Sequence, residues 1–190
     1  DPDTNYVDAD AAVTVQLFSP SVRPPRVLVV GEDDPTLSRA LDDVAAPRYL
    51  AAGSRAGRRS RRDGVADAAA LAGPDAALDH DDDGVLGSWE RTWGLVVPEG
   101  NPAGLSGLPS LVDDDVRFAN RDTESGLRAR FDAALDDLAA DRDETRDALT
   151  DDVSGYELAT RGHESPARRV ADGAVDAGLG LESTADRLDL

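Results

Sequence analysis

The chain contains no cysteine, no methionine and no lysine, and it has two histidines. Without cysteine, a disulfide framework and a thiolate metal site are both excluded, which leaves little for a metal site beyond carboxylates. No apolar run approaches the ~20 residues that a transmembrane helix needs, so we expect no membrane span in this chain. Because the sequence begins at Asp1 without methionine, we expect a processed or excised segment, whose signal peptide, lipid anchor or upstream domain would not be visible here.

Signatures of several enzyme classes are absent as well. The sequence has no G-x-S-x-G nucleophile elbow, no P-loop, no H-E-x-x-H helix and no thiol nucleophile. Aspartates are so abundant that no pair stands out as an acid–base couple. We therefore expect a protein that is not an enzyme, with no metal and no cofactor.

The charge that is present is strongly one-sided. The 39 acidic residues are 31 Asp and 8 Glu, all 20 basic residues are Arg, and the net charge is −19. The aspartates are scattered along 190 residues that are 40% hydrophobic, enough for one domain with a real core. Such a dispersed acidic surface is typical of salt-adapted, halophilic proteins, because molar salt screens its self-repulsion. The alternative, an acidic partner-binding surface, would more often be clustered.

The only basic patch is the arginine cluster within 55–62. Since it lacks interleaved aromatic residues and the chain is acidic, we expect no direct nucleic-acid binding.

Strands and helices are predicted to alternate along the chain. Apolar, β-branched runs predict strands at 26–31, 48–53, 92–100, 116–120, 155–160 and 174–180. Capping residues and 3.6-residue periodicity predict helices at about 33–44, 107–114, 124–140, 165–173 and from 182 onward. Four segments are predicted less sharply: one strand at 11–18 within a linker, a strand or a helix at 65–73, a loop at 74–88, and a solvated helix or a loop at 142–152. The pattern predicts an α/β fold with mainly parallel sheets flanked by helices.

Polar turns follow several of these strands and precede helices, at 51–57, 100–108, 119–128 and 160–169. In an open α/β sheet, ligands bind outside the carboxyl ends of the strands, where such turns converge. The residues that we expect to meet in one cleft are Ser54, Asn120, Arg121, Ser125 and His163. Hydroxyl and amide donors combined with N–H groups at helix starts would bind an oxyanion.

Each of these residues also has a purely structural interpretation. Ser54 and Ser125 could be ordinary helix N-caps, and Asn120 could simply end its strand. Arg121, and even more so Arg128, could be ion-pair partners among so many aspartates. His163 could equally be structural.

The order of the motifs resembles a known family. The segments are R-T-W-G-L (91–95), G-N-P (100–102), N-R-D-T-E-S-G-L-R (120–128), G-Y-E (155–157) with His163, D-A-G-L-G (176–180), and the earlier G-S-R-A-G (53–57) with G-V-A-D (64–67). They resemble the type II periplasmic-binding-protein-like domain of molybdate- and tungstate-responsive regulators and of ABC transporter solute-binding components, in a haloarchaeal form. The resemblance covers about 26–188.

The resemblance implies a two-lobed fold that binds a small oxyanion without covalent chemistry. A linker at 1–25 would precede the domain at 26–190, with one lobe at about 26–88, the other at about 92–180, and a C-terminal return that is cut short. The ligand, molybdate or tungstate, would be held by Ser54, Asn120, Arg121, Ser125, Gly126, Arg128 and His163. The partner would be a helix-turn-helix DNA-binding domain in the cytoplasm, the setting we favour, or a transporter permease outside it.

The sequence departs from the family within the segments that would bind the ligand. Glu124 replaces a glycine, Leu127 and Gly162 replace threonines, and Arg58 replaces a leucine. Two hydroxyl donors are lost and a carboxylate is added, so the alternative is a ligand-free regulatory or interaction module that has kept the fold with a degenerate pocket. We expect Glu124 and Leu127 to be the residues that would close the site.

Overall fold

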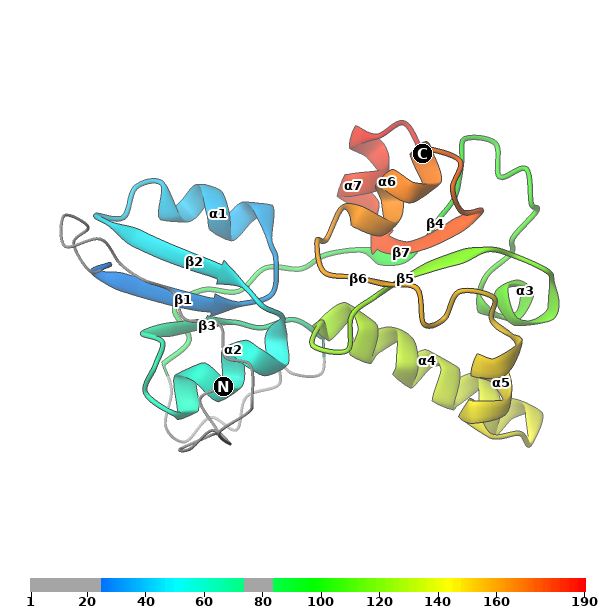
Figure 1. Cartoon of the computed structure of the whole chain (residues 1–190), viewed down its shortest axis with the longest axis horizontal. Helices are drawn as coiled ribbons and strands as arrows, with labels where there is room; N and C mark the ends of the chain where they lie inside the picture. The colour runs from blue at the N-terminus through cyan, green and yellow to red at the C-terminus, as the bar shows by residue number, and fades with distance from the viewer. Residues whose placement is uncertain (1–24, 74–83) are drawn as a thin grey trace, which may run out of the picture.

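The computed structural model describes residues 25–73 and 84–190. The strand expected at 11–18 and most of the loop expected at 74–88 lie outside the described residues. Two sheets lie at opposite ends of the long axis of the molecule, each with its own helices (Figure 1). Among the described residues, none of the helices has the length and apolar character that crossing a bilayer would require.

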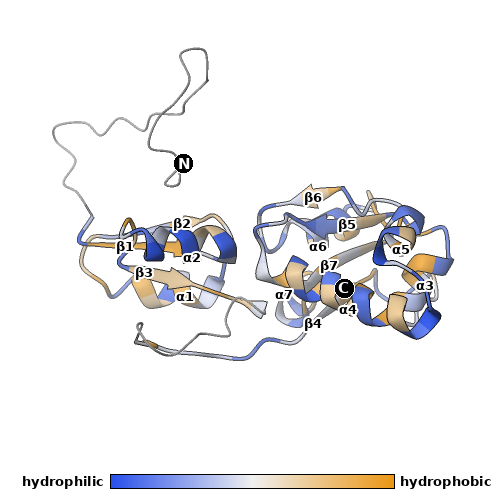
Figure 2. Ribbon diagram, turned by 90° about the horizontal axis from the view of Figure 1, so that it is seen from below, coloured by the Kyte–Doolittle hydropathy of each residue, from blue (hydrophilic) through white to orange (hydrophobic). Residues whose placement is uncertain are grey.

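The first lobe is a three-stranded parallel sheet in the order β2-β1-β3. Its strands are β1 (Val27–Gly31), β2 (Pro47–Ala51) and β3 (Ala68–Ala70), and its helices are α1 (Pro35–Leu41) and α2 (Ser54–Arg62). Figure 2 shows hydrophobic residues on β1 and β3 and hydrophilic residues on α2. The segment at 65–73, for which both strand and helix were open, contains the strand β3, because its alanines pair with the buried strand β1.

The second lobe is a four-stranded sheet in the order β4-β7-β5-β6, in which only β4 runs antiparallel. Its strands are β4 (Trp93–Val96), β5 (Phe118–Arg121), β6 (Ala159–Thr160) and β7 (Ala177–Leu181). Its helices are α3 (Leu108–Asp113), α4 (Gly126–Arg142), α5 (Arg146–Asp152), α6 (Ser165–Ala171) and α7 (Glu182–Arg187). The predicted α/β class with mainly parallel sheets is confirmed.

The larger core lies in the second lobe and is built on α4. Leu127, Phe131 and Leu135 of this helix are buried, as their spacing predicted, and the ring of Phe131 stacks on Phe118 of β5 at 5.2 Å. This packing fixes where β5 ends and where α4 begins, which are the two points that supply polar groups to the space between the lobes.

Two predicted strands are shorter than expected, for a local reason. The strand predicted at 155–160 is reduced to β6, because Tyr156 N–H and Leu158 N–H bond to carbonyls three residues back and so form turns. The strand predicted at 92–100 ends at Val96, since a turn follows in which Asn101 N–H bonds to the Pro98 carbonyl. The segment at 142–152 contains the helix α5, capped by Thr145.

Candidate functional site

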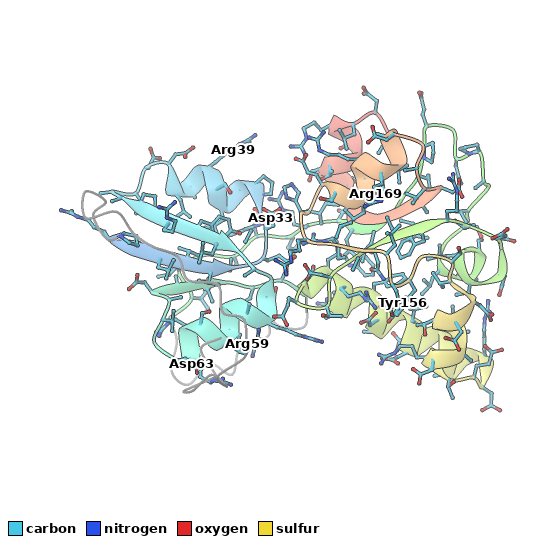
Figure 3. The ribbon with its side chains drawn as sticks, in the orientation of Figure 1. Asp33, Arg39, Arg59, Asp63, Tyr156 and Arg169 are labelled. Atoms are coloured by element: carbon cyan, nitrogen blue, oxygen red, sulfur yellow. The ribbon has the colours of Figure 1, made fainter. Side chains whose placement is uncertain are left out.

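Polar residues follow β1 and β5 at the ends of these strands, where the two lobes face each other. Glu32, Asp33 and Asp34 come directly after β1, and we call them the acidic turn. β5 ends at Arg121, and the chain then turns through Ser125 into α4. Figure 3 shows Asp33 at the boundary between the lobes. Two carboxyl ends of strands and two helix starts therefore meet at this boundary.

The carboxylate of Glu32 is the centre of the arrangement. Its Oε1 accepts hydrogen bonds from Ser125 Oγ at 2.7 Å and from Arg121 Nη2 at 3.0 Å. Its Oε2 accepts from Ser54 Oγ at 2.8 Å and from the Gly126 N–H at 2.8 Å. We call these four donor residues the cradle. Ser54 comes from the first lobe and the other three come from the second, so the cradle spans the two lobes.

Both serine hydroxyls are oriented by the backbone. Ser54 Oγ accepts from the Ala72 N–H at 2.9 Å, and Ser125 Oγ accepts from the Leu127 N–H at 3.2 Å. Because each hydroxyl has one hydrogen, accepting from the backbone leaves that hydrogen to point at the carboxylate. Ser125 is thus an N-cap and a donor at once, whereas Ser54 is the first residue of α2 and caps nothing.

The cradle is closed to water. Ser54 and Ser125 are fully buried, and Arg121 and Glu32 are 2% and 7% exposed. Arg121 also donates to the Arg161 carbonyl at 2.9 Å, while its buried Nε has no hydrogen-bond acceptor among the described residues. In such a low-dielectric site, an ion pair is kept only when both charges are well hydrogen-bonded. Glu32 meets this condition with four donors, and Arg121 retains donor capacity.

The other two residues of the acidic turn bind groups beside the cradle. Asp33 Oδ2 accepts from the His163 N–H at 3.0 Å and lies 2.9 Å from His163 Nδ1. The hydrogen bond from the His163 side chain is the main cause that lowers the pKa of Asp33. Burial raises the pKa of Asp34, but hydrogen bonds from Arg91 and Trp89 outweigh this effect and leave it lowered. Asp34 also caps α1.

The structure brings together some of the predicted site residues and separates others. Ser54, Arg121, Ser125 and Gly126 surround one carboxylate, and His163 lies beside them on Asp33. Their predicted roles toward a ligand stay predictions.

Asn120 and Arg128 do not donate to the carboxylate. Asn120 holds the end of β5, with Nδ2 on the Tyr156 carbonyl and Oδ1 on the Arg121 N–H. Arg128 turns toward Asp132 at 2.8 Å and lies over the Tyr156 ring, with its guanidinium 4.1 Å from the ring centroid. Its Nη1 donates to the Arg121 carbonyl. The side chains of Asn120 and Arg128 therefore both bond to the backbone of Arg121.

The residues expected to close the cradle do not enter it. Glu124 forms an ion pair with Arg59 at 2.9 Å and is partly exposed, and Leu127 packs into the core of the second lobe. The side chain that fills the site is Glu32, which sequence reasoning missed because 33–35 was interpreted only as a helix start. The available signal was an acidic residue immediately after a buried parallel strand.

Tight backbone packing joins the lobes around the cradle. A methyl group added at Gly126 would lie 2.1 Å from the Ala72 carbonyl oxygen and 2.8 Å from Ser54 Oγ. A methyl group at Gly53 would lie 2.5 Å from the Glu124 carbonyl oxygen, and the Arg55 N–H bonds to that oxygen at 3.2 Å. Glycine is needed at both positions so that the donors reach one carboxylate.

Two surface hollows lie elsewhere, one of about 340 Å³ beside β4 and α4 and one of about 350 Å³ under α1, and no cradle residue lines either. Within the described ranges, no group of three or more carboxylate or imidazole side chains has the arrangement of a metal site.

Comparison with known protein families identifies the family of this chain. Residues 37–190 match the family described as the PBP superfamily domain. The chain belongs to the PBP superfamily. This membership indicates that the domain is a binding domain rather than an enzyme, as the sequence predicted.

Two individual proteins are similar over part of their length. The uncharacterized protein YvgK of Bacillus subtilis (strain 168) is 34% identical over 95 residues, which are 50% of this chain and 28% of YvgK. The chain thus matches little more than a quarter of that relative. The sulfate-binding protein SubI from Mycobacterium tuberculosis H37Rv has a similar fold, with a TM-score of 0.55 and 17% identity over 86% of this chain and 67% of SubI.

Proposed function

We propose that this domain binds a small oxyanion in the cradle between its lobes. One observation carries the proposal: four preoriented donors from both lobes converge on the two oxygens of one carboxylate. A buried set of hydroxyl, amide and guanidinium donors, all with hydrogens pointing inward, suits a negative group and repels a cation. The fold shared with a sulfate-binding protein supports the same class of ligand.

The more specific ligand in this proposal is molybdate or tungstate. That choice rests on the family resemblance of the cradle segments. A tetrahedral oxyanion offers four oxygens, two more than a carboxylate, and the buried Nε of Arg121 has no hydrogen-bond partner among the described residues. Because Leu127 and Gly162 replace threonines of the family, two hydroxyl donors for molybdate are lost. Sulfate is therefore titrated alongside molybdate and tungstate.

We further propose that lobe closure reports the bound anion to a partner. The partner is a helix-turn-helix domain if the protein is a cytoplasmic regulator, and a permease if it is an extracytoplasmic transporter component. A ligand that contacts both lobes stabilises the closed state by its differential affinity, which is what either partner would read. Cell fractionation of the whole protein separates the two settings.

The acidic surface supports a salt-adapted, haloarchaeal source. The net charge of −19 is dispersed, and no lysine contributes to the positive charge. Molar salt would screen this surface without reaching a buried cradle, so a local anion site is compatible with the overall charge.

The test is isothermal titration at high salt with sulfate, molybdate and tungstate. Because Glu32 fills the cradle, the titration uses both the wild-type chain and Glu32→Ala. Ser54→Ala and Ser125→Ala should each weaken binding about ten- to a hundredfold, since a hydrogen bond to a charged group contributes roughly 1.5–3 kcal/mol. Ser183→Ala, at an exposed position on α7, is the matched control and should bind unchanged. The absence of heat and of any melting-temperature shift, in both chains and for all three anions, would refute the proposal.

A second candidate function is a regulatory or interaction module that no longer takes a ligand. The observation that favours it is the Glu32 carboxylate, which already accepts a hydrogen bond from each of the four cradle residues with the lobes in contact. Thermal shift across a broad set of anions and organic acids distinguishes the two functions, because a module with a lost pocket would respond to none, with or without Glu32.

A further inference from the structure

We propose that Glu32 is a tethered occupant of the cradle, which holds the two lobes together when no ligand is bound and which an incoming oxyanion must displace. This inference concerns the regulation of the cradle and, in its binding half, rests on the proposed function. The other part of the inference is that Glu32 joins the two lobes, which we call the clamp. This part rests only on the contacts of Glu32 and not on ligand binding.

The contacts of Glu32 are those of a bound anion. Each carboxylate oxygen accepts two hydrogen bonds, and each oxygen is shared by two different residues of the cradle. Three of the four donors belong to the second lobe, whereas the Glu32 backbone belongs to the first. The side chain therefore joins the lobes in the way a ligand bound between them would.

The backbone of Glu32 is fixed, so only the side chain is able to leave. Its N–H bonds to the Ala70 carbonyl at 2.8 Å, and its carbonyl accepts from the Tyr49 hydroxyl. Burial raises the pKa of Tyr49 to about 12, which keeps that hydroxyl protonated as a donor. Rotation about the side-chain bonds of Glu32 is the available route out of the cradle.

The rest of the acidic turn keeps Glu32 aimed at the second lobe. Asp33 is bound by the backbone and the ring of His163, which follows β6. Asp34 is bound by Arg91, which precedes β4, at 3.1 Å. While the lobes are closed, these contacts and those of Glu32 together place the acidic turn beside the cradle.

A tethered group competes at a high effective concentration. Short tethers give effective concentrations in the millimolar range, so a free oxyanion has to overcome that occupancy before it binds. The carboxylate also neutralises the buried Arg121, and two anions beside Asp33 would repel each other. An oxyanion and the Glu32 carboxylate are therefore mutually exclusive in the cradle.

Glu32→Ala removes the occupant and leaves Arg121 unpaired. We expect its affinity for sulfate, molybdate or tungstate to exceed the wild-type affinity by about tenfold or more. Added oxyanion should also raise the melting temperature of Glu32→Ala by more than that of the wild type. Glu32→Gln, which keeps the side-chain volume if the alanine variant folds poorly, should show the same direction. Glu99→Gln, at an exposed position, is the matched control for the lost charge.

A second readout measures the clamp without any ligand. Because the chain lacks cysteine, spin labels at Asp43→Cys in the first lobe and Asp151→Cys in the second report one distance between the lobes. With Glu32 in place and no oxyanion, we expect a single narrow distance distribution. In Glu32→Ala the distribution should broaden toward longer distances, and oxyanion should restore the narrow one.

The two readouts separate the possible failures. An unchanged distance and an unchanged affinity in Glu32→Ala and Glu32→Gln would overturn the tethered occupant, while wild-type oxyanion binding would leave the proposed function standing. A broadened distance with no oxyanion binding in any variant would support the clamp and refute the proposed function. Wild-type affinity equal to that of Glu32→Ala would overturn the competition.

Discussion

At the scale of single residues, the cradle depends on two small side chains, those of Ser54 and Ser125, and on the lack of a side chain at Gly126. Gly126 donates its N–H to Glu32 while the Ala72 carbonyl lies against its α-carbon. Ser54 Oγ and Ser125 Oγ each accept a hydrogen bond from a backbone N–H, which leaves the hydroxyl hydrogen to donate to the carboxylate. The site therefore tolerates little added volume and no loss of a hydroxyl.

Gly126→Ala should destabilise the chain by about 1–3 kcal/mol, because the new methyl group overlaps the Ala72 carbonyl and Ser54 Oγ. Urea unfolding followed by circular dichroism measures this difference. Gly94→Ala is the control, since a methyl group there meets nothing within 4 Å, and its effect should stay within about 0.5 kcal/mol. Equal effects of the two substitutions would contradict the tight approach of the lobes.

The Asp33–His163 contact should make stability depend on pH in the acid range. The pKa of Asp33 is lowered from its ordinary value of 3.8, chiefly by the His163 side chain. A lowered folded pKa means that the carboxylate stabilises the fold above its unfolded pKa and loses this contribution as the pH falls through the folded pKa.

We expect the difference in unfolding free energy between wild type and Asp33→Asn to be largest above pH 3.8 and to shrink as the pH falls below it. Urea unfolding of both chains at a series of pH values measures it. A difference that is constant across this range would show that the contact does not depend on the charge of Asp33. Asp43→Asn, at an exposed position, controls for the loss of one surface carboxylate.

At the scale of elements, α4 sets the position of the second lobe's donors. Its apolar face packs on the sheet through Phe131 and Leu135, and its start carries Ser125 and Gly126 to the space between the lobes. The helix thus links the core directly to the cradle: if its packing loosens, the two donors move.

Phe131→Ala should cost about 3–5 kcal/mol of unfolding free energy, because the ring is 1% exposed and stacks on Phe118. Chemical denaturation measures the loss. Leu86→Ala serves as the control, since this leucine is 90% exposed, and its cost should be under about 0.5 kcal/mol. A small effect of Phe131→Ala would mean that α4 is not held by this core.

At the scale of the whole molecule, one buried negative group joins two lobes within a strongly negative surface. The charge of −19 comes from 39 acidic and 20 basic residues, while Glu32 is the only buried acidic residue among those that the structure describes. Repulsion among the exposed carboxylates is screened by salt, whereas the buried Glu32–Arg121 pair is screened much less.

Stability should therefore rise with ionic strength. The Debye length falls from about 10 Å at 0.1 M salt to about 3 Å at 1 M, which removes most of the repulsion between surface carboxylates. Differential scanning calorimetry in potassium chloride over roughly this range should show a rising melting temperature. A melting temperature that is flat or falls with salt would contradict the salt-adapted interpretation of the surface.

The sequence predicted the elements well where the cause is local. Periodic apolar residues placed α4, and β-branched runs placed β1 and β5. The polar turns after the strands predicted one cleft for Ser54, Asn120, Arg121, Ser125 and His163, and the structure brings Ser54, Arg121 and Ser125 onto one carboxylate with His163 beside them. The sequence predicted less well where turns compete with strands, as in the shortened β6 and β4. Local hydrogen bonds decide those boundaries, and residue preferences alone do not reveal them.

What the sequence alone determined is the α/β class, the alternation of strands and helices and the donor chemistry of the cradle, because each follows from residue type and spacing along the chain. What only the tertiary structure decided is which side chain those donors meet. Glu32 and Gly126 are 94 positions apart, and only the approach of the two lobes brings the carboxylate to the N–H. Glu124, next to Ser125 in the sequence, forms an ion pair with Arg59 of α2 instead. Proximity along the chain therefore indicated the wrong carboxylate, since the contact depends on how the two lobes pack.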